Sequence, residues 1–401
     1  MNTDALVAAL QAHNQDRDPQ LLRMKYQKMA QSAFLFLRGA DHLFYDALPD
    51  QPLFRGAPLA WACGDLHVEN FGSYKGDNRQ VYFDINDFDE GALAPASWDL
   101  VRLLASIQCG ADSLRVSAPE AADLSAHCLD AYRAALADGK PRCVERETSV
   151  GLIQDLLCDL KNRKRADFLD KRTTCKNQRR SLKLDGDKAL PLLPGQLELL
   201  TGFLPRYAQQ QDNPGFYTML HAGRRIAGTG SLGLMRFVVL VEGKGSPDGN
   251  YLLDIKECKP SALAPRLAAW KIGQPAWPDQ ASRVVAVQQR MQAVDHAFLH
   301  AIALDGKSCV LRGLQPSEDR VALDAWGKKI SRLEEVIATM GRNLAWDQLR
   351  AAGRSGAASA DELIAHGHDD GWRQPMLAAA AAMTKLTQSQ WQASKAWLAS
   401  A

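Results

Sequence analysis

The chain has 401 residues, enough for one large or two ordinary domains, and its hydrophobic (46%) and charged (23%) contents are ordinary for a soluble globular protein. Its net charge of +2 argues against nucleic-acid binding as the main role, and no apolar run approaches the roughly 18 residues that a membrane-spanning helix needs. Residues 1–20 lack the apolar core of a signal peptide, and the eight cysteines show neither a C-x-x-C pair nor zinc spacing, so we expect a cytoplasmic protein with reduced thiols and no membrane partner.

The first half of the chain is mainly helical in pattern. Residues 20–48 show helical apolar spacing, and residues 58–90 hold short apolar runs broken by Gly and Asp, which predicts a small hairpin. Helices are expected from Trp98 to about residue 160, with an Ala-rich amphipathic stretch at 118–137. The segment 161–183 is strongly basic, which is typical of a solvated surface or of a site for an anionic ligand.

The second half changes character. Residues 226–240 are Gly-rich and then rich in β-formers, and a Gly/Pro/Asn turn separates them from a predicted strand at 251–256. A helix is expected at 281–303, a short strand at 309–312, helical structure from 318, and a closing helix at 377–401.

Two acidic motifs lie in the predicted hairpin. They read Cys63-Gly64-Asp65-Leu66-His67-Val68-Glu69-Asn70 and Asp84-Ile85-Asn86-Asp87-Phe88-Asp89-Glu90. Phosphoryl transfer needs one carboxylate that orients the attacking hydroxyl and oxygen ligands that hold a metal on the phosphates. We therefore predict that Asp65 is the catalytic residue and that Asn70 and Asp87 bind metal, with Asp89 as a second carboxylate ligand or a solvated side chain. The protein kinase equivalents are H-R-D-x-x-x-x-N and D-F-G.

A G-x-G-x-x-G string supplies a candidate phosphate-binding loop. Its predicted ligand-binding residues are Gly228, Thr229, Gly230, Ser231 and Gly233. Because β-forming residues follow this string, the glycines are expected between strands, as in a kinase glycine-rich loop, rather than before a helix. The next strand ends in Lys256, which resembles the V-A-I-K lysine that neutralises the α and β phosphates. A tight hairpin with no ligand is the alternative reading of the glycines.

The order of these motifs is the reverse of that in a kinase. A circular permutation resolves this, so we predict an α+β, two-lobed, protein-kinase-like fold with the catalytic loop first. Residues 1–208 and 317–401 would form the helical lobe, and residues 209–316 the nucleotide-binding β lobe. This hypothesis requires Lys256 to lie within about 15 Å of Asp65 and Asp87.

The chain resembles a known family, the bacterial domain of unknown function 2252, over most of its length. The matching strings are Phe36-Leu37-Arg38-Gly39, Gly64 to Gly72, Ile85 to Glu90, Trp98-Asp99-Leu100 and Gly228 to Gly233. The Gly64-Asp65-Leu66-His67 string is also similar to the H-G-D-L-H loop of aminoglycoside phosphotransferases and choline kinases. The resemblance implies a kinase-like fold and brings no established reaction.

Three residues are expected to support the site. His67 would anchor its loop, and Asp99 would brace the catalytic loop through backbone amides. Arg38 would reach a phosphate or form a structural ion pair. Asp65, Asn70 and Asp87 have capping roles as their alternative reading.

The expected function is ATP-dependent transfer of phosphate to a hydroxyl of a small-molecule acceptor, with Mg²⁺ or Mn²⁺ as the metal. A kinase pairs its strand Lys with a helix Glu, and residues 283–301 contain no Glu. This absence favours, as the first alternative, a weakly active pseudokinase or nucleotide-binding regulatory module. AMP transfer and metal-dependent hydrolysis are the further alternatives.

Overall fold

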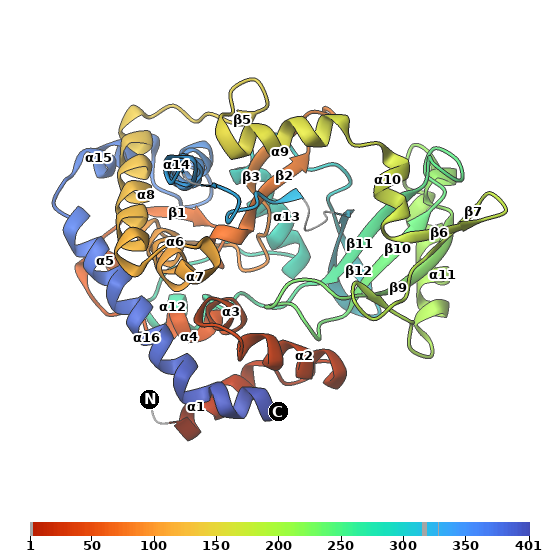
Figure 1. Ribbon diagram of the computed structural model, residues 1–401, viewed down its shortest axis with the longest axis horizontal. Helices are drawn as coiled ribbons and strands as arrows, with labels where there is room; N and C mark the ends of the chain where they lie inside the picture. Colours follow the sequence, from red (N-terminus) through yellow and green to blue (C-terminus); the bar gives the residue numbers. More distant parts are fainter. Residues whose placement is uncertain (1–2, 315–318, 328) are drawn as a thin grey trace.

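The structure is a computed structural model that describes residues 3–314, 319–327 and 329–401. Helix accounts for 48% and strand for 16%, so the predicted α+β class is confirmed, and the largest sheet curls into a half-barrel. Most helices gather at one end of the molecule, and the large sheet lies at the other (Figure 1). In the described ranges, no helix combines the length and apolar character needed to cross a bilayer.

The helical end is built from segments of both halves of the chain. It contains α1 (Thr3–His13), α2 (Pro19–Met29), α3 (Ala33–Gly39), α4 (Asp41–Asp46), α5 (Pro52–Arg55), α6 (Ser97–Cys109), α7 (Ala111–Leu114), α8 (Ala118–Asp138), α9 (Gly151–Asn162), α14 (Ser331–Arg350), α15 (Ala360–His368) and α16 (Arg373–Ser400). Helix α8 packs against α6, α14 and α15, and α16 packs against α1, α2 and α6. The nearly continuous burial of α6 places it in the centre of this core.

Two small sheets carry the acidic motifs. Strands β1 (Leu59–Ala62) and β4 (Ala92–Pro95) pair antiparallel, as do β2 (Phe71–Lys75) and β3 (Val81–Ile85), while β5 (Val144–Glu145) pairs with β3. The 3₁₀ turn η1 (Val68–Asn70) leads directly into β2. Because Phe71 lies opposite Ile85 in this ladder, the residues just before β2 and just after β3 meet at one end of the hairpin. The hairpin expected within residues 58–90 is present.

The large sheet has six strands in the order β12-β13-β11-β10-β9-β8, and all neighbours are antiparallel. Its strands are β8 (Ala189–Leu190), β9 (Met219–Arg225), β10 (Arg236–Val241), β11 (Tyr251–Glu257), β12 (His300–Leu304) and β13 (Lys307–Gly313). Helix α11 (Gln196–Ala208) and the 3₁₀ turn η2 (Pro214–Tyr217) cover one face through an apolar cluster. Helix α10 (Arg165–Asp170) and the hairpin β6–β7 (Thr173–Lys176, Arg179–Leu182) contact the other face. Helices α12 (Ala264–Ala269) and α13 (Gln280–Met291) follow β11.

The structure differs from the sequence expectations in several element bounds. The helix expected over 281–303 ends at Met291, and residues 300–304 form strand β12, which pairs with β13. The helical pattern expected from 318 begins at Ser331 in the described part of the chain. The expected β lobe begins at residue 209. Strand β8 and helix α11 precede that residue, and both pack with the large sheet. The boundary expected at 316/317 lies outside the described residues.

Candidate functional site

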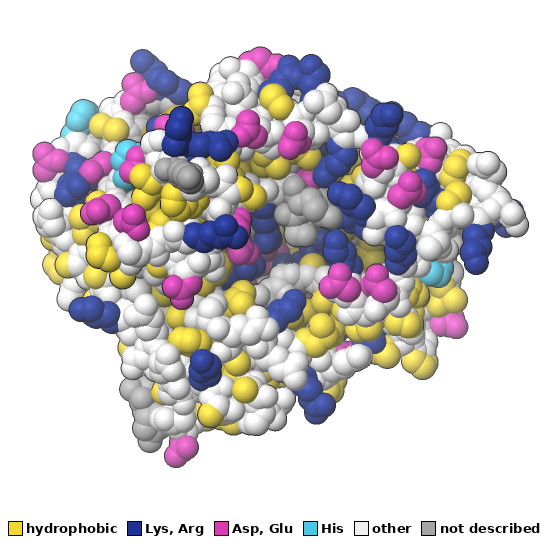
Figure 2. Space-filling model, in the orientation of Figure 1, with side chains coloured by type: hydrophobic (Ala, Val, Ile, Leu, Met, Phe, Trp, Pro, Cys, Tyr) yellow, Lys and Arg dark blue, Asp and Glu magenta, His cyan; other side chains and the backbone are white. Residues whose placement is uncertain are grey.

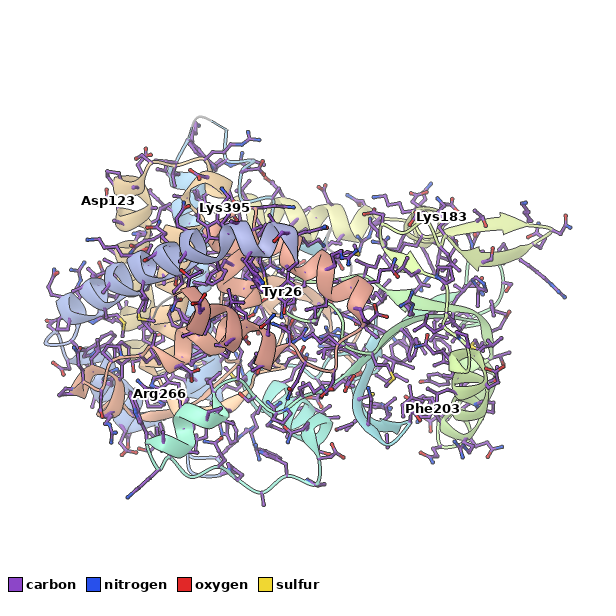
Figure 3. All side chains as sticks on the ribbon, turned by 90° about the horizontal axis from the view of Figure 1, so that it is seen from below. Tyr26, Asp123, Lys183, Phe203, Arg266 and Lys395 are labelled. Carbon is purple, nitrogen blue, oxygen red and sulfur yellow. The ribbon has the colours of Figure 1, made fainter. Side chains whose placement is uncertain are left out.

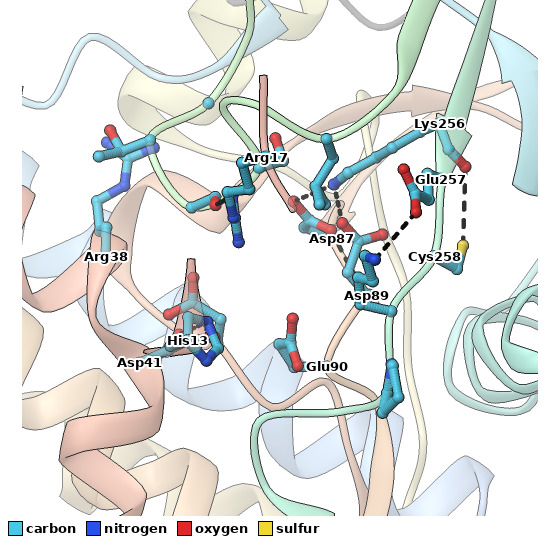
Figure 4. A pocket seen from close by; sticks show the side chains of 18 of the residues that line it. His13, Arg17, Arg38, Asp41, Asp87, Asp89, Glu90, Lys256, Glu257 and Cys258 are labelled. Atoms are coloured by element: carbon cyan, nitrogen blue, oxygen red, sulfur yellow. Dashed lines mark hydrogen bonds and ion pairs between the residues drawn. The ribbon is translucent and has the colours of Figure 1, made fainter. Parts of the chain in front are cut away.

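One cavity of about 290 Å³ brings most of the predicted site residues together (Figure 4). It lies where the small hairpin, the glycine-rich loop and strand β11 meet. Its lining includes Arg38, Asp65, His67, Asn70, Asp87, Asp89, Gly228, Thr229, Gly230, Ser231 and Lys256. Gly233 and Asp99 do not line it. Gly233 lies in the glycine-rich loop, and Asp99 accepts N–H groups of the loop that carries Asp65.

Helix α6 holds the loop that carries Asp65. The Asp99 carboxylate accepts the backbone N–H groups of Cys63 at 2.8 Å and Gly64 at 3.0 Å. Gly64 has φ = +94°, and a Cβ there would collide with the backbone of Glu90. Burial raises the pKa of Asp99 to about 6, while the two N–H donors act in the opposite direction. The bracing contact expected for Asp99 is therefore present in the structure.

Asp65 is fixed by an arginine that the sequence reasoning missed. Nε of Arg102, on α6, donates to Asp65 Oδ1 at 2.9 Å, and Nη2 donates to the same oxygen. The other oxygen, Oδ2, lies 3.9 Å from His67 Nε2. Burial raises the pKa of Asp65 to about 7, although Arg102 lowers it. Arg102 lies three residues after Asp99, a helical spacing that puts both on one face and could have identified it.

The predicted metal ligands converge at the end of the hairpin. Asn86 N–H donates to Asn70 O at 2.8 Å, which fixes the two strand ends side by side and brings Asp87 next to Asn70. The Asn70 side-chain amide donates to the backbone oxygen of Asp65, so its own carbonyl oxygen remains as a possible ligand. Together with Asp87 and Asp89, this gives an all-oxygen donor set, which suits Mg²⁺ or Mn²⁺.

Lys256 on β11 reaches these carboxylates. Its Nζ contacts Asp89 and lies 3.8 Å from Asp87 Oδ2. Burial alone would raise the pKa of Asp87, but Lys256 and Arg312 outweigh it and hold that pKa below its usual range. The helix glutamate of kinases has no counterpart among these contacts. The partners of Lys256 are carboxylates of the second acidic motif.

The glycine-rich loop joins the antiparallel strands β9 and β10, as the sequence predicted. Gly228 and Gly233 have φ values of +70° and +90°, which favour glycine. A Cβ on Gly230 would approach Arg38 O at 3.1 Å and Asp65 Oδ2 at 4.0 Å, so the loop passes close to the Asp65 carboxylate.

Two basic side chains that the sequence reasoning did not identify hold the loop, and one of them, Arg17, also lines the cavity. Arg17 Nη1 donates to the carbonyl oxygens of Gly230 at 2.6 Å and Leu232 at 2.7 Å. Lys25 Nζ donates to Gly230 O at 3.1 Å, and Asp18 N–H donates to Gly233 O at 2.9 Å. These contacts span more than 200 residues of sequence, so no local pattern announces them.

The remaining predicted residues have structural partners. Arg38 forms an ion pair with Glu69, which is the structural alternative considered for it, while it also lines the cavity. His67 Nδ1 accepts the N–H of Glu69 at 3.2 Å, and burial holds the pKa of His67 well below its usual range. A neutral, buried His67 fits a loop anchor. Glu90 is a further cavity residue, and burial raises its pKa to about 8.

Comparison with known families assigns the chain to one of them. It belongs to the family described as "Uncharacterized protein conserved in bacteria (DUF2252)", whose model matches residues 17–396. No curated protein matches the chain, and no solved structure does. Membership agrees with the resemblance seen in the acidic and glycine-rich strings.

Proposed function

We propose that this member of the family is an ATP-dependent phosphotransferase that acts on a hydroxyl of a small-molecule acceptor. The observation that carries the proposal is the meeting of three distant motifs in one cavity. Asp65, the oxygen ligands of the second acidic motif and Lys256 line the same space beneath the glycine-rich loop. Each of these groups has a counterpart in phosphoryl transfer, where positioning and charge neutralisation do most of the work.

The strand order supports a kinase-like arrangement of the sheet. Counted from the strand that enters the glycine-rich loop, β9, Lys256 lies on the third strand, β11, as the phosphate-binding lysine does in protein kinases. The sheet follows the catalytic loop in the chain, whereas in kinases it precedes it. Helices α1 and α16 pack against each other, so a circularly permuted relation to kinases needs no long connection.

The reaction would use Asp65 as its proton acceptor. The acceptor hydroxyl would lie against Asp65 Oδ2, because Oδ1 is engaged by Arg102. As the hydroxyl oxygen forms its bond to the γ-phosphorus, its proton passes to Asp65, and the bond from that phosphorus to the β-phosphate oxygen breaks to release ADP. Asp99 and His67 keep the loop in place during this step.

The nucleotide would lie under residues 228–233, with Lys256 on its α and β phosphates. Asn70, Asp87 and Asp89 would hold Mg²⁺ or Mn²⁺, which would neutralise the phosphate charge. Lys256 would then exchange carboxylate partners for phosphate oxygens. The loop backbone, kept open by its glycines, can approach those oxygens without a Cβ in the way.

The test compares Asp65→Asn with Asp112→Asn, an exposed acid on α7 that serves as a matched control. The two variants and the natural chain are incubated with labelled ATP, Mg²⁺ and a pool of hydroxyl-bearing metabolites. We expect Asp65→Asn to lose transfer by at least about 100-fold, the usual contribution of a general base, while it still binds nucleotide. Full activity of Asp65→Asn would contradict the role of Asp65, and product masses that carry AMP instead of phosphate would indicate adenylyl transfer.

A nucleotide-binding regulatory module is the second candidate. The contacts of Lys256 favour this second candidate. The lysine pairs with two of the proposed metal ligands, and among its contacts there is no helix glutamate that would compete for it. In that case Mg²⁺ and ATP raise the melting temperature, and no metabolite in the pool becomes labelled.

A further inference from the structure

A second cavity of about 310 Å³ adjoins the first on the side of the sheet. The two cavities share Asn70, Asp87, Gly228, Ser231 and Arg320. The second one continues along the face of β10 and β13, past Val238 and Leu314, toward the β6–β7 hairpin. Figure 2 shows Lys and Arg side chains gathered around the hollow between the helical end and the sheet.

The two cavities have opposite charge. Among the residues that the structure describes, seven Asp or Glu and five Lys or Arg line the first, whereas four Asp or Glu and nine Lys or Arg line the second. Partly desolvated charges of one sign repel one another more strongly than they would in water. The second cavity therefore favours an anionic occupant much more than the first does.

The floor of the second cavity keeps its positive charge. Asp254 is fully buried and forms ion pairs with Arg225 at 2.6 Å, Arg236 at 2.6 Å and Arg312 at 3.7 Å. Asp254 thus pairs with three guanidinium groups. Burial acts to raise the pKa of Asp254, but the three arginines outweigh it and hold that pKa far below its usual range. The cluster stays ionised, with more positive than negative charge.

The basic segment 161–183 divides into two parts in the structure. Lys171, Arg172 and Lys183, at the base of the β6–β7 hairpin, line the cavity, whereas Lys176 and Arg179, near its tip, are exposed and do not. Part of this segment is therefore a wall of the cavity, and part is a solvated surface.

We infer that the second cavity binds phosphate groups additional to the triphosphate at the metal position, so that the ligand is a phosphate chain longer than that of ATP or a nucleotide with a further phosphate. This inference rests on the proposed function for the orientation of the ligand. The shared residues Asn70 and Asp87 would hold the metal, and Asp65, in the first cavity only, faces the acceptor. The additional phosphate groups of the ligand then extend into the second cavity.

The experiment uses the full chain and inorganic tripolyphosphate as the probe, without metal or nucleotide, in a calorimetric titration. The test variant is Lys171→Gln/Lys183→Gln, and the matched control is Lys176→Gln/Arg179→Gln, which removes the same charge from the same hairpin. We expect the test variant to weaken binding by at least about tenfold and the control by less than about twofold, because direct charge-assisted contacts outweigh screened ones. Equal weakening in both variants, or no binding to the natural chain, would overturn the inference.

Further titrations distinguish the sources of the phosphate. Polyphosphates of increasing length, a nucleotide with an extra ribose phosphate, and ATP are compared with Mg²⁺ present. If affinity rises with chain length, the ligand is inorganic polyphosphate. If the nucleotide with the extra ribose phosphate binds most tightly, the ligand is a nucleotide of that kind. If ATP binds as tightly as both, the inference fails.

The two proposals fail separately. If the natural chain transfers labelled phosphate, and Lys256→Met abolishes Mg²⁺–ATP binding while metal-free tripolyphosphate still binds, both proposals stand. If the natural chain binds tripolyphosphate in the basic cavity but transfers no phosphate, the proposed function fails and the anion site remains. If the natural chain transfers phosphate but does not bind tripolyphosphate, only the proposed function remains.

Discussion

Arg102 donates two N–H groups to the same oxygen of Asp65, and the second oxygen of that carboxylate lies 3.9 Å from the neutral His67. The carboxylate is therefore fixed in rotation, and only Oδ2 is left for the proton transfer that we propose. Its arginine partner is fully buried on α6 and also donates to Leu37 O at 2.9 Å. In the phosphotransfer that we propose, a carboxylate held in this way would lower the cost of orientation during reaction.

The first prediction concerns pH. Burial raises the pKa of Asp65 to about 7, and only the ionised carboxylate can accept a proton. The value of kcat/KM should therefore rise as pH increases through about 7. Removing the positive charge in Arg102→Met raises the pKa further, so this acid limb should move to higher pH. His67→Gln is the control and should leave the limb in place, because His67 is uncharged in this range.

Glu90 offers the outcome that would contradict this assignment. Its pKa is raised by burial to about 8, and it lines the same cavity. A limb that stays in place in Arg102→Met and moves in Glu90→Gln would assign the titration to Glu90. Circular dichroism of each variant checks that the fold is retained.

The second prediction concerns Lys256. Lys256→Met removes the cation that contacts Asp87 and Asp89, which should lower the free energy of unfolding by about 2 kcal/mol, less than for a fully buried pair because both acids are partly exposed. Mg²⁺ without nucleotide should then raise the melting temperature of the variant more than that of the natural chain, since the lysine no longer competes for the ligands. Urea unfolding and thermal shifts over a Mg²⁺ series measure both effects.

Lys259→Met is the matched control. Lys259 lines the same cavity and pairs with Glu257 at 3.2 Å, but its side chain is 46% exposed. It should change stability by less than about 1 kcal/mol and leave the Mg²⁺ response unchanged. An equal Mg²⁺ response in Lys256→Met and the natural chain would count against Asp87 and Asp89 as metal ligands.

Short sequence strings single out residues that the structure brings to one cavity. Asp65, Asn70, Asp87, Gly228 and Gly230 stand out because their chemistry and spacing are local, while their roles stay predictions. Arg102 and Arg17 were not found, because their contacts join residues 37 and more than 200 positions apart. Such pairings depend on how helices pack, which apolar periodicity alone does not specify.

The error at residues 281–303 has a similar cause. The helix ends after Met291, and residues 300–304 become a strand because they pair with β13. Whether a short segment at the edge of a sheet forms a strand depends on its partner strand more than on its own residues. The carboxylate partners of Lys256 were also not predicted, because no local pattern shows that the loop after β3 folds back onto β11.

The third prediction concerns the hydrogen bonds between Arg17 and the glycine-rich loop. Arg17→Gln removes the hydrogen bonds to Gly230 and Leu232, so the loop should sample more conformations and bind Mg²⁺–ATP about tenfold more weakly. Arg23→Gln, an exposed arginine on the neighbouring helix α2, is the control and should bind normally. Calorimetry measures the affinity. If Arg17→Gln binds as tightly as the control, the loop does not depend on this contact.

The last prediction concerns a buried acid pair away from the cavity. Asp84 on β3 and Asp347 on α14 are both buried, and Arg350 Nη1 donates to Asp347 Oδ1 at 2.8 Å. Burial raises the pKa of Asp84 to about 6, although the nearby Asp347 acts to lower it. Burial and the nearby Asp84 carboxylate raise the pKa of Asp347 well above its usual range. The folded protein therefore holds a proton that the unfolded chain, with carboxyl pKa values near 4, releases.

The sign of the pH dependence follows from these raised pKa values. The contribution of the pair to stability is complete below about pH 4 and is lost as pH rises through about 6 and above. Asp347→Asn removes one titrating group and keeps the shape, and its amide can donate to Asp84. The variant should therefore gain about 1–2 kcal/mol over the natural chain at pH 8 and much less at pH 5. Urea unfolding at both pH values measures this difference, and an equal difference at the two would show that the pair does not share a proton.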